Sequence, residues 1–536
     1  MTQPGPMAFT APHRLATRAG QQVLQEGGTA IEAMVAAAAA ISVVYPHMNA
    51  IGGDGFWLIH QPGQEPVAID ACGQAGQRAS IDWYAEQGLN QIPERGGAAA
   101  LTGAATIKGW QLALSLYPTH LPLARLLEPA IAYARHGFEV SESLVAAMEK
   151  LSVVDNSNTS FRSLYYQQGQ PYPAGSLFTN PDLAQTFEQL ARAGLDDFYT
   201  GDLGQHIAQA LVQAGSPLTF DDLQQTQAEQ VQPVSLTLSD SQVYNLPPST
   251  QGPASLMILA LVDRLRTTEL LQADTELQWT HAIVEATKRA FQWRNACITD
   301  RTRLPAAYDR MLTSDTLQNE AGAITTQATT WPAQAQLGDT VWMGACDQYG
   351  TMVSFIQSVF FEFGCGVAIP DGGFVWNNRG SSFSLDKNDL NSLQPGAKPF
   401  HTLNPAYAMF NDGRRLAYGT MGGEGQPQTQ AAVFSRYAWR NQPLTDAVAA
   451  PRWLLGRTWG EATNNLKLEA DLAAEIGDDL AHQGHDLETV PAQSELMGHA
   501  GAVLLTPDAA TAATATAAVD PRSDGAAWTQ NNQETP

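Results

Sequence analysis

The run from Thr340 to Phe360 constrains the fold more than any other stretch of the sequence. It contains two strand-like segments, 340–347 and 351–360, and the turn "DQYG" at 347–350, where Asp347 and Gly350 suit the two ends of a type I turn. Both segments are apolar on both faces, which is typical of strands in the centre of a covered sheet. This hairpin therefore needs a covering layer on each side.

Two helices are predicted near the N-terminus. Residues 14–26 form the first, which Gly27 and Gly28 can end, and Thr29 can cap a second helix that is rich in alanine. The second helix has almost no polar face, so we expect it to be buried. Farther along, the segment 234–265 reads as two short strands, a Pro/Ser/Gly turn and a helix.

Two stretches of biased composition are predicted to lie outside the core. Residues 317–336 are rich in Gln, Ala and Thr and read as a flexible connector that ends just before the hairpin. The Ala/Thr tract at 507–528 reads as surface chain. A chain of 536 residues with 44% apolar composition can still bury a sizeable core and shield an active site.

The charge balance argues against two classes of partner. The chain has 29 Lys and Arg against 53 Asp and Glu, which gives a formal net charge of −24. A surface of this sign repels phosphate backbones and anionic lipids, so neither nucleic acid nor a membrane is expected as a partner. If the substrate is an anion, an arginine beside the catalytic group must overcome this field.

The cysteines and the N-terminal segment favour a cytoplasmic protein. The cysteines are scattered, with no CxxC pair and no Cys/His cluster of zinc spacing, so we expect buried free thiols and no metal. The N-terminal segment lacks the apolar core of a signal peptide, and the longest apolar run, 33–45, is too short to cross a bilayer. The cysteines are Cys72, Cys297, Cys346 and Cys365.

Three short motifs could carry chemistry, although each is common in ordinary loops and turns. They are "GDTV" at 338–341, "WNNRGSSFS" at 376–384 and "GTMGGEGQPQTQ" at 419–430. The sequence has no GxSxG, HExxH or phosphate-loop motif. His47 and His401 sit in proline-containing turns, where a structural role is more common than a catalytic one. The order of the three motifs, after a connector, fits an N-terminal nucleophile hydrolase.

The chemistry expected of such an enzyme needs few groups. A Thr hydroxyl is a weak nucleophile, but cleavage of the bond before Thr340 would free an α-amine with a pKa of about 8 that can take the hydroxyl proton. The N–H groups of Gly422 and Gly423 could approach the resulting oxyanion closely, because glycine has no Cβ. The same hydroxyl could attack the Asp339 carbonyl and so make the cut itself.

At these motifs the sequence resembles the γ-glutamyltransferase family, nearly from end to end. The resemblance implies a mixed α/β, four-layer αββα sandwich of the N-terminal nucleophile hydrolase type, which needs no cofactor. It also implies a proenzyme that cuts itself between Asp339 and Thr340 into segments 1–339 and 340–536, which stay together. Ser358 falls where the family places a hydroxyl beside the nucleophile. The matching stretches are "VVYPHMNAIGGDGFW", "LPPSTQGPASLMILALVD", "HAIVEATKRAFQWRNACITD", "GDTVWMGACDQYGTMVSFIQS", "NNRGSSFS", "GTMGGEGQPQ" and "DPRSDGAA".

The departures from the family carry the argument about the substrate. The family's transferases grip the amine and carboxylate of glutamate, and the chain differs at the positions that correspond to those contacts. An ammonium group needs an accepting partner in a dry site, and that partner is missing here. Arg379 instead brings a cation whose fork fits a carboxylate, unless it pairs with a structural acid such as Glu362 or Asp371. The differing positions are Ser382, Phe360, Arg379, His401, Thr402 and, approximately, Cys72.

A small acid that carries an amide and no α-amine is therefore the expected substrate class. Within the family the motifs look most like the oxamate amidohydrolase branch, which implies hydrolysis of oxamate to oxalate and ammonia late in purine breakdown. Arg379, His401, Thr402 and Ser382 are the candidates for binding the substrate, and Phe360 and Trp342 are expected to narrow the pocket. The open alternatives are a γ-glutamyl or glutaryl amide hydrolase or transferase, and an unprocessed relative that only binds. A higher oligomer is also left open.

Overall fold

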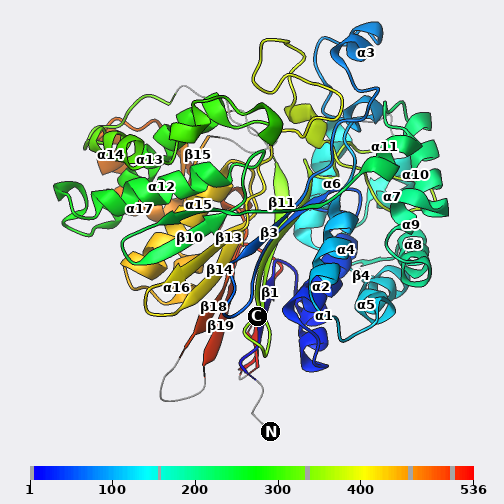
Figure 1. Cartoon of the computed structure of the whole chain (residues 1–536), viewed down its shortest axis with the longest axis horizontal. Helices are drawn as coiled ribbons and strands as arrows, with labels where there is room; N and C mark the ends of the chain where they lie inside the picture. The colour runs from blue at the N-terminus through cyan, green and yellow to red at the C-terminus, as the bar shows by residue number, and fades with distance from the viewer. Residues whose placement is uncertain are drawn as a thin grey trace.

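Two β-sheets lie face to face, and helices cover the outer face of each sheet (Figure 1). The computed structural model describes residues 5–154, 159–331, 338–456, 463–507, 513–530 and 532–535. Four layers follow one another across the molecule in the order helix, sheet, sheet, helix. The predicted αββα sandwich is therefore confirmed.

The first sheet has eight strands, and the predicted hairpin lies in its centre. The strand order is β21-β20-β1-β11-β12-β2-β3-β8, and each neighbouring pair is antiparallel. Gly350 N–H donates to the Asp347 carbonyl over 2.9 Å, which closes the expected turn between β11 and β12. The bounds are β21 Asn532–Thr535, β20 Ala526–Thr529, β1 Ala8–Ala11, β11 Asp339–Cys346, β12 Met352–Phe360, β2 Asp54–His60, β3 Val67–Ala71 and β8 Glu229–Val231.

The second sheet has six strands in the order β19-β18-β14-β13-β10-β9, again all antiparallel. Strands β9 and β10 and the helix after them match the prediction for 234–265. The Ala/Thr tract was expected as surface chain, but it supplies β19 at the edge of this sheet and β20 in the other. The bounds are β19 Thr514–Val519, β18 Ala500–Thr506, β14 Arg415–Thr420, β13 Ala406–Phe410, β10 Ser241–Asn245 and β9 Val234–Thr237.

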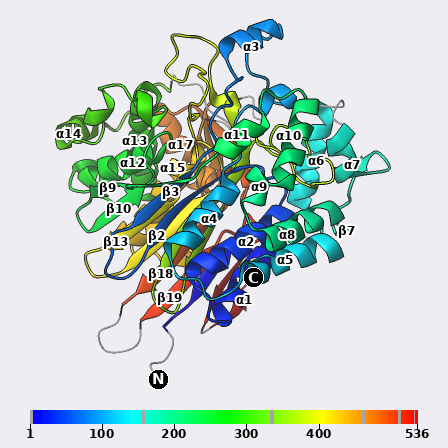
Figure 2. The same ribbon diagram turned by 45° about the vertical axis from the view of Figure 1, so that its right-hand side comes forward.

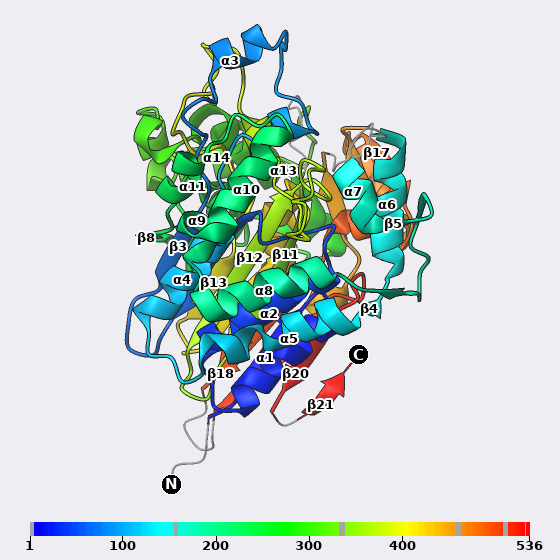
Figure 3. The same cartoon turned by 90° about the vertical axis from the view of Figure 1, so that its right-hand side faces the viewer.

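The helix layer on the first sheet contains the alanine-rich helix. Thr29 caps that helix and exchanges hydrogen bonds with Glu32, and all 15 of its residues are buried, as predicted. Figures 2 and 3 bring this layer forward, with the strands of the sheet behind it. Its helices are α1 Arg14–Gln25, α2 Ala30–Val44 and α4 Thr106–Leu116 on the strands, with α5 Leu123–His136 and α8 Pro181–Ala193 packed outside them.

The helix layer on the second sheet surrounds the long helix α13 (Glu276–Cys297), which packs against its neighbours. None of the helices within the described ranges is long and apolar enough to cross a membrane. The other members of this layer are α12 Gly252–Leu265, α15 Gly425–Phe434, α16 Leu444–Ala449 and α17 Ala470–His482. The remaining elements are α3 Ile81–Glu86, α6 Glu142–Val154, α7 Thr159–Tyr165, α9 Asp197–Thr200, α10 Asp202–Gln213, α11 Phe220–Gln225, α14 Ser314–Gly322, β4 Phe138–Glu139, β5 Tyr166–Gln167, β6 Gln170–Pro171, β7 Leu177–Phe178, β15 Trp453–Leu455, β16 Leu466–Glu469 and β17 Leu487–Val490.

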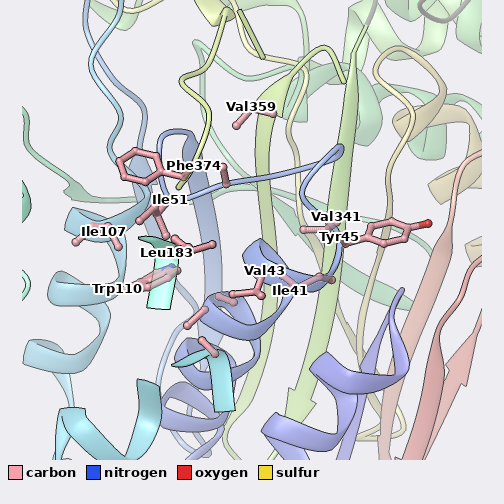
Figure 4. Packing of buried hydrophobic residues seen from close by; sticks show 14 of the residues in the cluster. Ile41, Val43, Tyr45, Ile51, Ile107, Trp110, Leu183, Val341, Val359 and Phe374 are labelled. Atoms are coloured by element: carbon pink, nitrogen blue, oxygen red, sulfur yellow. The ribbon is translucent and has the colours of Figure 1, made fainter. Parts of the chain in front are cut away.

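Strand alternation sends the two faces of the hairpin into different layers. Val341 and Val359 belong to the same apolar cluster as Ile41 and Val43 of α2, in the core beneath the helices (Figure 4). Trp342 and Ile356 belong instead to the apolar cluster between the two sheets. Even-numbered residues of β11 therefore face the second sheet, and this includes the position of Thr340.

Trp342 joins the two sheets near that point. A Cβ added to Gly419 of β14 would lie 2.2 Å from Trp342 Cδ1, and one on Gly501 of β18 would lie 2.5 Å from its Cζ3, so the indole lies directly on both glycines. Its Nε1–H donates to Ser354 Oγ over 2.9 Å. The Trp342 side chain is buried in the apolar cluster between the sheets, on the same face of β11 as Thr340, and its effect on the width of the pocket stays a prediction.

The predicted connector 317–336 is more ordered than expected over much of its length. Its first six residues lie in α14, and a buried ion pair on α13, Lys288 Nζ to Glu285 Oε1 at 2.6 Å, binds Thr329. Glu285 Oε2 accepts from the Thr329 N–H at 3.1 Å and from its hydroxyl at 2.6 Å, while Lys288 donates to the Thr329 carbonyl. Residues 332–336 of the connector lie outside the described residues.

Candidate active site

Thr340 is the second residue of β11 and lies where the strand pairing is irregular. Asp339 pairs with Phe360 and Val341 with Gln357, so the partner strand carries one extra residue between these pairs. Such a β-bulge redirects side chains and is common beside active sites. The Thr340 side chain is buried, and its Oγ1 has no hydrogen-bond partner among the described residues. The hydroxyl is therefore not committed to a structural contact.

Ser358 lies in the extra part of β12, across from Thr340. Its Oγ accepts a hydrogen bond from the Phe360 N–H over 2.8 Å, which fixes the backbone of the bulge. Phe360 has a φ of +83°, which is uncommon for a bulky residue and marks local strain. On its other side Ser358 pairs with Asp54 of β2. Ser358 therefore lies on the strand that neighbours Thr340, and its role beside that hydroxyl stays a prediction.

Gly422 and Gly423 form the turn between β14 and α15. Their φ values are +112° and +52°, in the left-handed region that favours glycine. Among the described residues, neither N–H donates to a protein acceptor. The turn also lies at the N-terminus of α15, where the aligned peptide dipoles favour negative charge. This arrangement can stabilise an oxyanion, which is the role predicted for the two glycines.

Arg379 is buried at the start of a short helix, Arg379–Ser382. Its guanidinium carbon lies 3.6 Å from the centroid of the Phe360 ring, and Nη2 donates to Thr402 Oγ1 over 3.1 Å. Nη1 has no partner among the described residues. A Cβ added to Gly338, two residues before Thr340, would lie 3.5 Å from the same Thr402 hydroxyl. The arginine and the threonine therefore lie beside the predicted cleavage site.

No carboxylate of the described residues forms an ion pair with Arg379. Glu362 lies 3.5 Å from Lys150 instead, so the alternative in which Glu362 or Asp371 neutralises Arg379 is not supported. Burial lowers the pKa of Arg379 to about 9, against the attraction of Asp54. The guanidinium remains charged at neutral pH, because even this pKa lies well above 7. A buried cation of this kind can receive an anionic ligand.

His401 faces Asp54 behind this arginine. His401 Nε2 lies 3.1 Å from Asp54 Oδ2, and the Leu403 N–H donates to Nδ1 over 3.3 Å, so Nε2 carries the hydrogen and donates to the carboxyl group. Burial lowers the pKa of His401 well below its usual value, and burial raises the pKa of Asp54 to about 7, although the Gly73 N–H and Arg379 oppose this rise. Both ring nitrogens of His401 are engaged, which favours a supporting role over direct contact with a substrate.

Ser382 and Phe360 border a cavity of about 570 Å³. The Ser382 hydroxyl lies within hydrogen-bond distance of the carbonyls of Arg379 and Phe400, at 2.9 and 3.0 Å, so it is used in part to hold the short helix. The other lining side chains are mostly polar or acidic, including Glu94 and Asp386. Phe360 lines this cavity and also contacts Arg379, so one aromatic side chain separates the cavity from the cation.

Asp54, Cys72 and His401 are a group whose donor atoms lie within 4.8 Å of one another in the part of the chain that the structure describes. They do not fit a metal site, because the ring nitrogens of His401 are engaged and Arg379 adds a positive charge nearby. Burial raises the pKa of the Cys72 thiol well above its usual value, which disfavours the thiolate that a metal would need. All four cysteines are free and buried, as predicted.

Sequence reasoning missed four residues that support this site, namely Asp54, Gln251, Arg294 and Glu424. Asp54 carried a readable signal, because it is an acid at the first position of an otherwise apolar strand. The other three form contacts between segments that are far apart in the chain, such as the ion pair of Arg294 and Glu424 at 2.6 Å. No local pattern reveals such a pair.

Comparison with known proteins gives one consistent result over almost the whole length. Residues 16–529 match the family described as Gamma-glutamyltranspeptidase. The oxamate amidohydrolase proenzyme of Klebsiella pneumoniae is 48% identical over 522 residues, which cover 96% of this chain and 97% of that protein. A glutathione hydrolase-like proenzyme, YwrD, of Bacillus subtilis is 36% identical, with 96% and 97% covered.

A solved structure is also similar over nearly the full length. It is the cephalosporin acylase from Bacillus halodurans, with a TM-score of 0.88 and 28% identity, and the match covers 98% of this chain and 96% of that one. The overall fold is thus shared with that acylase over nearly the full length of both chains.

Proposed function

The chain belongs to the gamma-glutamyltranspeptidase family and is a hydrolase that acts on amides, and on this premise we propose that it cuts itself before Thr340 and then hydrolyses a small carboxylate amide, oxamate above all. The observation that carries the choice of substrate is the buried Arg379, which is charged, has no carboxylate partner among the described residues and donates to Thr402. The α-amine of a γ-glutamyl substrate would face this cation instead of an acidic partner that could accept its hydrogen bonds.

The relatives support the same choice. The Klebsiella pneumoniae protein, at 48% identity, is named for its action on oxamate. Oxamate has one carboxylate next to one amide, so Arg379 and Thr402 would bind the carboxylate while the amide carbonyl lies at Thr340. The family's carboxylate-binding arginine corresponds approximately to Cys72, and the Arg379 cation lies close enough to Cys72 to influence its thiol. Arg379 would thus supply the positive charge from a different loop, and its charge would lie near the position of the family's arginine.

Self-cleavage begins with the hydroxyl of Thr340. Its Oγ attacks the Asp339 carbonyl carbon, the C–N bond breaks, and the chain becomes an ester with a free α-amine on Thr340. Water then hydrolyses the ester and releases the carboxylate of Asp339. Segments 1–339 and 340–536 would remain together, because β11 and β12 of the second segment pair directly with β1 and β2 of the first.

Substrate hydrolysis uses the same atoms. The α-amine of Thr340 takes the proton from Oγ, which attacks the amide carbon, and the Gly422 and Gly423 N–H groups bind the oxyanion. The C–N bond breaks, and ammonia leaves with the proton that the amine carried. Water then hydrolyses the acyl ester, which gives oxalate and restores the hydroxyl. Ser358 orients Thr340 through the bulge. We place this reaction in purine breakdown, as the family resemblance implies, and in the cytoplasm, where the four free cysteines would stay reduced.

The test combines a denaturing gel with an assay for ammonia. Wild-type protein should give two bands and release ammonia from oxamate, while Thr340→Ala should stay at full length and be inactive. Thr340→Ser is the matched control, because it keeps a hydroxyl and should still be cut. Cleavage of a γ-glutamyl anilide without release of ammonia from oxamate would favour a γ-glutamyl hydrolase or transferase. A wild-type chain that stays uncut and inactive would indicate a binding protein.

A further inference from the structure

Gln251, the residue before α12, contacts two loops of the candidate site with a single group. Its Nε2 donates to the Thr402 carbonyl over 2.7 Å and to the Gly423 carbonyl over 2.8 Å. Its backbone N–H donates to the His401 carbonyl over 2.9 Å. The side chain is fully buried, so these bonds form away from water, where leaving a carbonyl unpaired is costly.

The orientation of this amide is fixed from behind. Arg294 Nη1 donates to Gln251 Oε1 over 3.1 Å, so the oxygen faces the arginine and the NH₂ group faces the two carbonyls. Arg294 in turn donates to Glu424 Oε1 over 2.6 Å and lies on the Phe291 ring, with 3.8 Å between the guanidinium carbon and the ring centroid. Arg294 and Glu424 are both buried. The amide therefore has one orientation and no freedom to turn.

The two loops that Gln251 joins would hold opposite ends of the substrate. Gly423 belongs to the turn that would bind the oxyanion, and Thr402 receives the hydrogen bond of Arg379, which would bind the carboxylate. Glu424, which follows Gly423, connects the first loop to the same arginine that holds the amide. One primary amide, with two N–H groups at a fixed angle, thus sets how far apart the two loops lie.

We propose that Gln251 is a positioning residue that sets the spacing between the oxyanion-binding turn and the carboxylate-binding loop, and thereby selects amides whose carboxylate is bonded directly to the amide carbon. This inference rests on the proposed function, because it assumes those roles for the two loops. In oxamate a single C–C bond joins the carboxylate carbon to the amide carbon. Rotation about this bond cannot change the distance between the two carbons, so the substrate cannot adapt to a wrong distance between the loops. A longer acid such as malonamate has an extra methylene and can adapt by rotation.

The test compares kinetics on two substrates in the processed enzyme. Gln251→Met keeps the length and burial of the side chain but removes both donors. A displacement of about 1 Å in a site can cost about 100-fold in rate, so kcat/KM for oxamate should fall by that order, and mainly in kcat. The loss on malonamate should be smaller, so the ratio of kcat/KM for oxamate to that for malonamate should fall at least tenfold. This ratio does not depend on how much of the variant is folded.

Asn180→Leu is the matched control. Asn180 is another buried amide, which donates to the Gly373 carbonyl over 2.7 Å and accepts from the Leu183 N–H, but it holds α8 and lies outside the site. This variant should be less stable and should keep the wild-type ratio. An unchanged ratio in Gln251→Met, with wild-type kcat on oxamate, would overturn the inference.

Crystal structures of the wild type and of Gln251→Met give a reading that does not depend on the substrate. The separation between the carbonyl oxygens of Gly423 and Thr402 should change by more than about 0.5 Å, the tolerance of a productive site. An unchanged separation would overturn the spacing role, even if oxamate proved not to be the substrate. Absence of ammonia release by the wild-type enzyme would instead count against the proposed function, and the structures would still decide the role of Gln251.

Discussion

Replacement of Arg379 by methionine should separate substrate recognition from stability. Methionine fills a similar volume without the charge. Burial lowers the pKa of Arg379 from its ordinary value to about 9, and at about 1.4 kcal/mol per pKa unit the folded protein bears a cost of about 5 kcal/mol for keeping this cation. The stacking on Phe360 and the bond to Thr402 return about 3 to 4 kcal/mol of that cost. The variant should therefore be as stable as the wild type, or up to about 2 kcal/mol more stable.

The catalytic effect should be large and specific for the carboxylate. Charge-assisted hydrogen bonds to a buried anion contribute about 3 kcal/mol, which corresponds to a factor of about 150. The assay compares kcat/KM for oxamate with that for oxamide, in which a neutral amide replaces the carboxylate. Wild-type enzyme should prefer oxamate, and Arg379→Met should lose most of this preference. Self-cleavage should continue, because the proposed attack of Thr340 Oγ on the Asp339 carbonyl assigns no role to Arg379.

A buried arginine with a carboxylate partner provides the contrast. Arg452 is as buried as Arg379 but pairs with Asp520, so Arg452→Met should lose about 3 to 5 kcal/mol. Chemical unfolding of both variants measures the difference. A loss of similar size in Arg379→Met would show that Arg379 has a structural partner, and an unchanged preference for oxamate over oxamide would refute its role as the carboxylate-binding residue.

Two further predictions concern groups around the site. In the folded protein the pKa of Asp54 is about 7, against an ordinary 3.8, so its contribution to the free energy of unfolding should fall as pH rises from about 4 to about 7 and stay level above that. Because Asp54→Asn cannot titrate, the difference in the free energy of unfolding between wild type and variant, measured by chemical unfolding, should change by up to about 4 kcal/mol over this window. A difference that does not depend on pH would contradict the raised pKa. Glu285→Gln should lower the free energy of unfolding by about 3 to 5 kcal/mol, because Lys288 is then buried without its partner. The double variant with Lys288→Met should recover part of this loss, and simple additivity of the two losses would show that the pair does not act as a unit.

The central hairpin and the two N-terminal helices could be predicted from local patterns, whereas the layered fold was implied by the resemblance to a family. The apolar hairpin, the cap at Thr29 and the order of the motifs depend on residues that are near neighbours in the chain, and each was found where expected. The Ala/Thr tract was misread because small residues give little signal for a strand, although pairing with β18 makes one of residues 514–519.

The support of the site could not be predicted in the same way. The contacts of Gln251 with Thr402 and Gly423 span about 150 residues or more, and they follow from how the two sheets lie together. The binding of Thr329 by Glu285 and Lys288 likewise depends on the position of α13, so composition alone made that stretch look free. The resemblance to a family pointed to the candidate catalytic residues, but only the structure shows the groups that surround them.

The packing of Trp342 has a consequence for how mutations in this protein should be interpreted. Trp342 is two residues after Thr340 in β11, and its indole packs directly on Gly419 of β14, three residues before Gly422. This ring therefore determines the distance between the strand that bears the Thr340 hydroxyl and the strand that leads to the glycine turn. A change to this ring should slow the reaction by moving the two strands relative to each other, as if an active-site residue had been lost. The size of one buried side chain thus limits how far the catalytic groups can shift before activity is lost. Random mutagenesis scored by activity would therefore assign part of the core to the active site.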